Sequence, residues 1–198
     1  MFTANHGTIY AITTSDYVED RVFLGTIAGD LKIVDKSLNL IDTINLVNNS
    51  NSDIVSLDTN ALGHLVYTSS NGYFGYYIPN TNEVLWHIHA GTNVRAKFDK
   101  DGYILLVTTD SVRKYSPDGV LLWEYAGAGG FRSVTTDNKG FIYVGTSTGY
   151  IYKIAPEGVA DRGAIWRYFL GEVIPELDSD LEGNIYTVFD GYSVAKLN

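Results

Sequence analysis

The sequence predicts an all-β protein made of repeated units, and three observations lead to this prediction. The phrase YSPDGVLLW, residues 115–123, recurs one period earlier at 77–86 and one period later from residue 154. Short strands rich in Tyr, Val and Ile alternate with turns that contain Gly, Asn or Pro. Acidic residues mark one turn of every repeat, 42, 41, 38 and 41 residues apart, at Asp16, Asp58, Asp99, Asp137 and Asp178. A period near 40 residues of short strands is typical of a β-propeller, in which each repeat is one blade.

Five markers predict five blades, and each of the first four contains four antiparallel strands. In the first blade, residues 8–46, we expect strands at 8–14, 21–27, 30–35 and 39–46. In the second, residues 53–89, they lie at 53–57, 64–69, 73–78 and 83–89. In the third, residues 93–125, they lie at 93–98, 103–108, 112–116 and 120–125. In the fourth, residues 131–170, they lie at 131–136, 141–146, 150–155 and 165–170.

The fifth blade, residues 173–198, contains only three predicted strands, at 173–177, 184–189 and 192–197. Phe2 precedes Asp16 by 14 residues, and Trp123 precedes Asp137 by the same 14. Residues 1–5 therefore align with an outermost strand. We expect them to complete the fifth blade, so that residues 1–198 form one closed ring without a second domain.

The repeat resembles that of the quinoprotein-type (PQQ-like) propellers. The phrase at 115–123, with GFIYVGT at 140–146 and GYIYKI at 149–154, carries this resemblance. The match is good in blades two to four and weaker in blades one and five, where Asp42 and Phe2 stand at the Trp position. In that family the Trp docks neighbouring blades, which implies this role for Trp86, Trp123 and Trp166. No residues match the metal-bearing site of the quinone enzymes, so the resemblance implies a fold and no cofactor.

Composition bounds the classes of function. The 14 basic and 23 acidic residues give a net charge of −9, which argues against binding nucleic acid or an anionic membrane. The absence of Cys excludes disulfides and thiolate metal sites. The N-terminus has no basic and apolar signal pattern, and no apolar run reaches 18 residues. These features predict a soluble protein made without a signal peptide, either cytoplasmic or associated with a virion.

Charged residues on the innermost strands are the candidate ligand site, at the mouth of the channel. Arg95, Lys97 and Arg132 fall on neighbouring inner strands and would bind a carboxylate, a phosphate or an acidic sugar. In the favoured alternative, Asp53 and Glu176 neutralise them as a structural network, because isolated buried charges are costly.

Three weaker candidate sites also have ordinary structural explanations. Asp178, Asp180 and Glu182 alternate before Gly183 as calcium ligands do, although a turn is the expected role. His87 and His89 project to the same side of an outer strand, and His64 lies in the same blade. Two imidazoles without a third ligand at fixed spacing favour solvated surface positions over a zinc site. The inner strands supply only three carboxylates for glycoside cleavage, at Asp53, Glu172 and Glu176.

The expected function is that of a non-enzymatic propeller that mediates protein–protein assembly. By fold and composition the chain resembles the propeller platforms of bacteriophage tail and receptor-binding components, an analogy without a motif behind it. The alternative is a lectin, similar to the five-bladed tachylectin type, in which aromatic side chains such as the three Trp bind a cell-surface glycan. A glycoside hydrolase is the third and least favoured reading.

Overall fold

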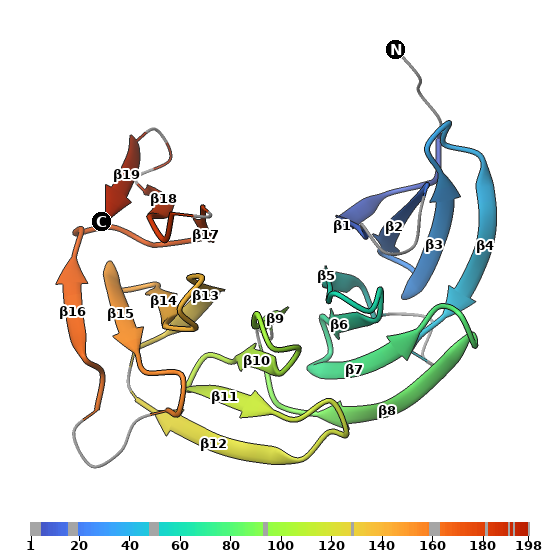
Figure 1. Ribbon diagram of the computed structural model, residues 1–198. Coiled ribbons are helices and arrows are strands. Elements are labelled where there is room, and N and C mark those ends of the chain that lie inside the picture. The colour runs from blue at the N-terminus through green and yellow to red at the C-terminus, as the bar shows by residue number, and fades with distance from the viewer. Residues whose placement is uncertain are drawn as a thin grey trace. The chain divides into compact units, whose positions relative to one another are not determined.

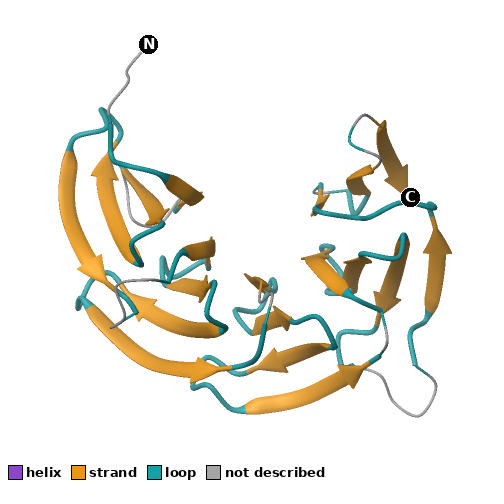
Figure 2. Cartoon of the chain, turned by 180° about the vertical axis from the view of Figure 1, so that it is seen from behind, coloured by secondary structure: helices purple, strands orange, loops and turns teal. Residues whose placement is uncertain are grey.

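The computed structural model describes residues 5–15, 20–47, 52–92, 95–127, 129–158, 163–180, 182–189, 191 and 193–197. The chain divides into two compact units, Met1–Phe98 and Asp99–Asn198, and each is described by itself. The regular structure of the described residues is entirely strand, as the sequence predicted (Figure 2). Nineteen strands in antiparallel sheets account for it.

The first unit contains two complete four-stranded sheets, each ordered as in the sequence (Figure 1). The first sheet consists of β1 (Ile9–Thr14), β2 (Arg21–Thr26), β3 (Asp30–Asp35) and β4 (Leu40–Asn45). The second consists of β5 (Ile54–Thr59), β6 (Leu65–Ser69), β7 (Tyr73–Ile78) and β8 (Glu83–His89). The last strand of this unit, β9 (Arg95–Phe98), belongs in sheet order to the third sheet.

The second unit continues the same pattern. The third sheet contains β10 (Ile104–Val107), β11 (Ser111–Tyr115) and β12 (Leu121–Ala126). The fourth consists of β13 (Phe131–Thr136), β14 (Ile142–Thr146), β15 (Tyr150–Ile154) and β16 (Trp166–Phe169). The fifth has three strands, β17 (Leu177–Ser179), β18 (Ile185–Phe189) and β19 (Ser193–Leu197). These five sheets are the five repeats that the sequence predicted.

Within each unit the hydrophobic cores lie between neighbouring sheets, which explains why the second strands are largely apolar. All the residues of β6, β10 and β14 are buried. In the second unit, Ile174 and Leu177 of the fifth repeat pack with Tyr143 and Ile151 of the fourth sheet. Gly145 permits this approach, because a Cβ at that position would collide with Ile174.

Two of the acidic residues predicted to mark the turn between the first two strands of a repeat do not lie in that turn. Asp58 lies inside β5 and Asp178 inside β17, so neither is a turn residue. The turn residues are Asn60, Asp99, Asp137 and Asp180, at intervals of 39, 38 and 43 residues. Each stands three positions before a Gly with positive φ, because the turn needs a side-chain acceptor and a left-handed residue at this spacing. Asp16 lies outside the described residues.

A second correction concerns the first strand of the fifth repeat. The sequence predicted a strand at 173–177, but β17 covers Leu177–Ser179. Pro175 has no N–H to donate to a neighbouring strand. The backbone N–H of Ile174 donates instead to the carbonyl of Thr146 in the fourth sheet, at 2.9 Å. Glu176 therefore precedes the strand rather than lying in it.

The predicted completion of the fifth blade by the N-terminus depends on residues of which most are not described. Residues 1–4 lie outside the described part of the chain. This part of the fold stays a prediction.

Candidate functional site

The turn residues form the most regular polar feature of the structure. One Asp99 carboxylate oxygen, Oδ1, accepts the backbone N–H groups of Asp101 and Tyr103, each at 2.9 Å. The same pair of bonds, to the residues two and four positions later, is made by Asn60, Asp137 and Asp180. Carboxylate and amide oxygens therefore serve here as acceptors for an otherwise unpaired backbone.

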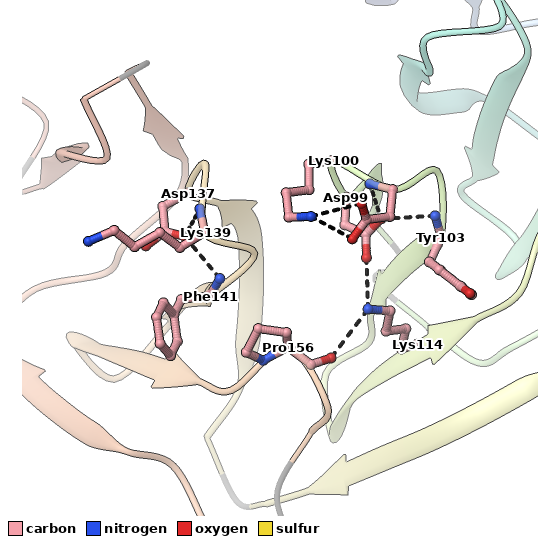
Figure 3. A network of polar contacts seen from close by, with 9 residues as sticks. Asp99, Lys100, Tyr103, Lys114, Asp137, Lys139, Phe141 and Pro156 are labelled. Carbon is pink, nitrogen blue, oxygen red and sulfur yellow. Dashed lines mark hydrogen bonds and ion pairs between the residues drawn. The ribbon is translucent and has the colours of Figure 1, made fainter.

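The second oxygen of Asp99 forms a buried ion pair with Lys114 of β11. Lys114 Nζ lies 2.7 Å from Asp99 Oδ2, and the two side chains are only 11% and 3% exposed. The same ammonium donates to the carbonyl oxygen of Pro156, at 3.2 Å, and lies 4.8 Å from the centre of the Tyr103 ring (Figure 3). Pro156 follows β15, so this hydrogen bond from Lys114 ties the third sheet to the fourth. The sequence interpretation missed this contact, although a Lys in an apolar strand was a visible signal.

In the fourth and fifth sheets a tyrosine takes the place of the lysine. Tyr143 Oη donates to Asp137 at 3.1 Å, and Tyr186 Oη donates to Asp180 at 2.9 Å. Burial raises the pKa of Tyr143, and the Asp137 carboxylate raises it further. Hydrogen bonds, chiefly from Asn184, lower the pKa of Asp180 to about 2. These carboxylates are therefore engaged in the turns that present them.

The calcium candidate coincides with the last of these turns. Asp180 accepts bonds from the backbone of Glu182 and Asn184 and from the side chains of Asn184 and Tyr186. Asp178 and Glu182 are exposed. Within the described part of the chain, no group of three or more acidic, His or Cys side chains is arranged to hold a metal ion.

The charged residues predicted at the channel mouth are divided between the two units. Asp53, Arg95 and Lys97 belong to the first unit, and Arg132 and Glu176 belong to the second. Arg95, Arg132 and Glu176 are exposed, while Asp53 and Lys97 are half-buried. Because they are divided in this way, their convergence on one anion site stays a prediction.

The three tryptophans contact apolar side chains. Trp123 packs against the cluster formed by the third and fourth sheets. Its ring lies so close to Gly158 that a Cβ added at that glycine would be 2.8 Å from the ring. Trp166 packs against the cluster of the fourth and fifth sheets. Trp86 lies 5.2 Å from the Phe74 ring. The Trp123 indole N–H is buried and has no hydrogen-bond partner among the described residues.

The histidines of the second sheet are held by tyrosines. His64 Nδ1 lies 2.9 Å from Tyr76 Oη, and His87 Nδ1 lies 2.9 Å from Tyr67 Oη. Burial lowers the pKa of both histidines. His89 packs edge-on against Tyr73.

A groove of about 530 Å³ lies between β16 and β19, wholly within the second unit. Residues 166–168 and 170 form one side and residues 195–197 the other. Arg167 and Lys196 are exposed, and each side chain lies on the face of its sheet that is turned away from this groove. Arg167 lies 5.2 Å from the Tyr150 ring centre, and Lys196 Nζ lies 5.5 Å from that of Tyr186.

The comparisons with known proteins identify the fold. No protein-family model matches the sequence, and no curated protein matches it. A solved structure, the β-propeller domain of Cps50 (Swd1) from Myceliophteria thermophila, matches with a TM-score of 0.82 and 12% sequence identity. The chain has a β-propeller fold. The match covers 98% of this chain and 66% of that one, so this chain spans just under two thirds of its length.

No described segment forms a helix that is long and apolar enough to cross a membrane.

Proposed function

We propose that this protein is a non-enzymatic β-propeller whose surface holds protein partners in an assembly. One observation supports this above the others. The outer strand of each four-stranded sheet exposes two adjacent apolar residues, and these pairs are Leu40–Ile41, Val84–Leu85, Leu121–Leu122 and Tyr168–Phe169.

The exposure of these pairs is unusual for edge strands. Their side chains are between 37% and 57% exposed. Edge strands of proteins that work alone are usually blunted by charged residues or Pro, because an apolar edge promotes association. A recurrence in four sheets indicates a surface that partners cover. The narrower proposal, a component of a phage tail or virion, rests on the analogy of fold and composition alone.

The test is affinity purification of the tagged protein from its native source, with cross-linking mass spectrometry. We expect cross-links to partner proteins near the outer strands, and loss of those partners in the double variant Leu121→Glu/Leu122→Glu. The control is Asp110→Lys, a charge change at an exposed position between β10 and β11 that leaves the apolar pair of β12 intact. Partners retained equally by both variants would contradict a role for this outer strand.

The lectin alternative makes a different prediction. A glycan-binding protein would bind defined sugars on a glycan array without any protein partner. Binding lost on substitution of Trp166, the Trp that borders the groove, would favour that alternative.

A further inference from the structure

We infer that an aromatic stripe on the fourth sheet binds a proline-rich segment of a partner protein that carries a carboxylate. The stripe consists of Tyr150 and Tyr152 of β15, Phe169 of β16 and Tyr125 of β12, with Arg167 of β16 beside it. This inference rests on the proposed partner-holding function and specifies the chemistry of one partner segment.

The first support is that the strand register brings these side chains to one face. Tyr150 lies opposite Phe169, and Tyr152 lies opposite Arg167. Residues two apart in a strand point the same way, so all four share the face of the β15–β16 pair that is turned toward the third sheet. The ring centre of Tyr150 is 4.8 Å from that of Phe169 and 6.1 Å from that of Tyr152, which in turn is 6.4 Å from that of Tyr125. The rings therefore form one continuous surface.

The second support is that the third sheet leaves this face open. The Phe169 side chain is 57% exposed, and Tyr125, Tyr150 and Tyr152 are half-buried. The hydroxyls of these three tyrosines make no hydrogen bond to another described residue, and none of them is a buried atom without a partner, so they reach solvent. The tyrosines at the turns of the fourth and fifth sheets differ, because their hydroxyls donate to carboxylates. An open aromatic surface with free hydroxyls is suited to a ligand from outside the chain.

The third support is the cation on the same face. The Arg167 guanidinium is exposed, lies 5.2 Å from the Tyr150 ring centre and forms no ion pair with any described residue. Burial raises the pKa of Tyr125, Tyr152 raises it further, and the positive charge of Arg167 lowers it. Arg167 is therefore within electrostatic reach of the Tyr125 end of the stripe as well as of Tyr150. On a chain of net charge −9, a cation held in this way is suited to bind a carboxylate from outside.

Comparison with the third sheet shows that the acid is missing from the fourth. Tyr152 and Arg167 occupy the positions that Arg113 and Glu124 take in the third sheet, as the strand pairing shows. Arg113 Nε lies 2.8 Å from Glu124 Oε1. In the fourth sheet an arginine stands at the position of the glutamate, and a tyrosine lies opposite. A carboxylate for Arg167 must therefore come from a segment other than these two strands.

The chemistry of the stripe also distinguishes between two classes of occupant. A polyproline II segment has no internal hydrogen bonds, and its Pro residues have no N–H, so its backbone presents acceptors. Pro-rich segments are bound on aromatic-lined surfaces in this way. The stripe offers rings, hydroxyls and a guanidinium, which only donates, and it contains no carboxylate or amide side chain. Sugar hydroxyls donate as well as accept and call for such acceptors, so a glycan is the competing occupant in the experiment below.

The test measures the binding of a fluorescent peptide of three Pro-Pro-Glu repeats to the full chain, by fluorescence anisotropy. We expect saturable binding that weakens about tenfold or more in Arg167→Glu and in Phe169→Ser, since each removes a contact at an exposed position. One matched control is Tyr168→Ser, which removes a 54% exposed ring from the opposite face of β16. The other is Lys139→Glu, which reverses an exposed lysine of the β13–β14 turn. Each control should change affinity less than about twofold.

The peptide and a conservative variant test each part of the chemistry. Replacing Pro by Ala, or Glu by Lys, in the peptide should weaken binding about tenfold or more, because the first removes the preformed extended segment and the second reverses the charge that meets Arg167. Tyr125→Phe removes one hydroxyl and keeps the ring, and should weaken binding about twofold to tenfold, as the loss of one hydrogen bond does.

Equal affinity of the parent, Arg167→Glu and Phe169→Ser would overturn the inference, as would a peptide that does not bind at all. Binding of an acidic oligosaccharide such as oligogalacturonate, without binding of the peptide, would show a glycan surface and overturn it as well. If native partners are captured equally by the parent and by Arg167→Glu, the stripe is excluded while the partner-holding function stands. If no partner is captured at all, that function itself fails.

Discussion

The turns at Asp99 and Asp180 are built alike but have different surroundings. In both, Oδ1 accepts two backbone N–H groups at 2.9 Å, and a Gly with positive φ stands three residues later. At Asp99 the second oxygen meets a buried lysine, which also bonds the carbonyl of Pro156 in the next repeat. At Asp180 the second oxygen meets Tyr186 and Asn184, both within its own repeat.

The two turns therefore share a local role, which is to bond their own backbone, but differ in their contacts with the next sheet. Both turns satisfy their own backbone. Only the Asp99 turn ties one sheet to the next, because Lys114 reaches beyond its own sheet. Substitutions that remove a long-range partner should therefore cost more than substitutions that change only the turn.

The largest effect is expected for Lys114→Met. The variant leaves the Asp99 carboxylate buried without its cation and removes the bond to Pro156. Breaking a buried pair by removing one partner costs about 3–5 kcal/mol. Urea denaturation should show this loss in the free energy of unfolding.

The matched control for that variant is Lys196→Met, the equivalent substitution in the fifth sheet. Its ammonium is exposed and lies against Tyr186 without a described ion pair. The expected change is within about 0.5 kcal/mol, as for most surface substitutions. Equal losses in the two variants would show that the Asp99 pair does not distinguish the two turns.

Trp123→Ala tests the other tie between the third and fourth sheets. The ring packs on the cluster of both sheets and on Gly158. Truncating a packed Trp costs about 3 kcal/mol, near the lower end of the range for such residues because this one is half-buried. A melting temperature within a degree of the parent would contradict the docking role.

A smaller contrast is expected between two turn glycines with positive φ. At Gly183 an added Cβ would meet nothing closer than 3.6 Å, so Gly183→Ala should cost about 1–2 kcal/mol from φ alone. At Gly158 an added Cβ would also collide with the Trp123 ring at 2.8 Å. Gly158→Ala should therefore cost about 1 kcal/mol more by the same measurement, since overpacking adds to the strain.

The smallest effect is a pH dependence at Asp180. Its pKa is lowered to about 2 in the folded protein, below its ordinary value of 3.8. The stability it contributes is therefore present above about pH 4 and is lost as the pH falls toward 2. Asp180→Asn should lose less stability than the parent between pH 5 and pH 2.5, in parallel denaturation curves. Identical losses would show that this carboxylate does not contribute.

Much of the fold could be predicted because strands and turns depend on residues that are close together in the sequence. The five acidic markers predicted five sheets, and short apolar runs between turn residues predicted all 19 described strands within a few residues. The strand at β17 was misplaced because Ile174 looks like a strand residue, whereas its N–H bonds to another sheet. The turn register was misread at Asp58 and Asp178, although the spacing from Asn60 and Asp180 to the following Gly was visible in the sequence.

The sequence alone determined the period, the turns and the strands, because each depends on residues at most a few positions apart. Only the tertiary structure decided which polar groups meet. The pairing of Lys114 with Asp99 and Pro156 joins residues from separate parts of the chain. A charge in one strand carries no sign of its partner in another, because that partner is selected by the packing of whole sheets.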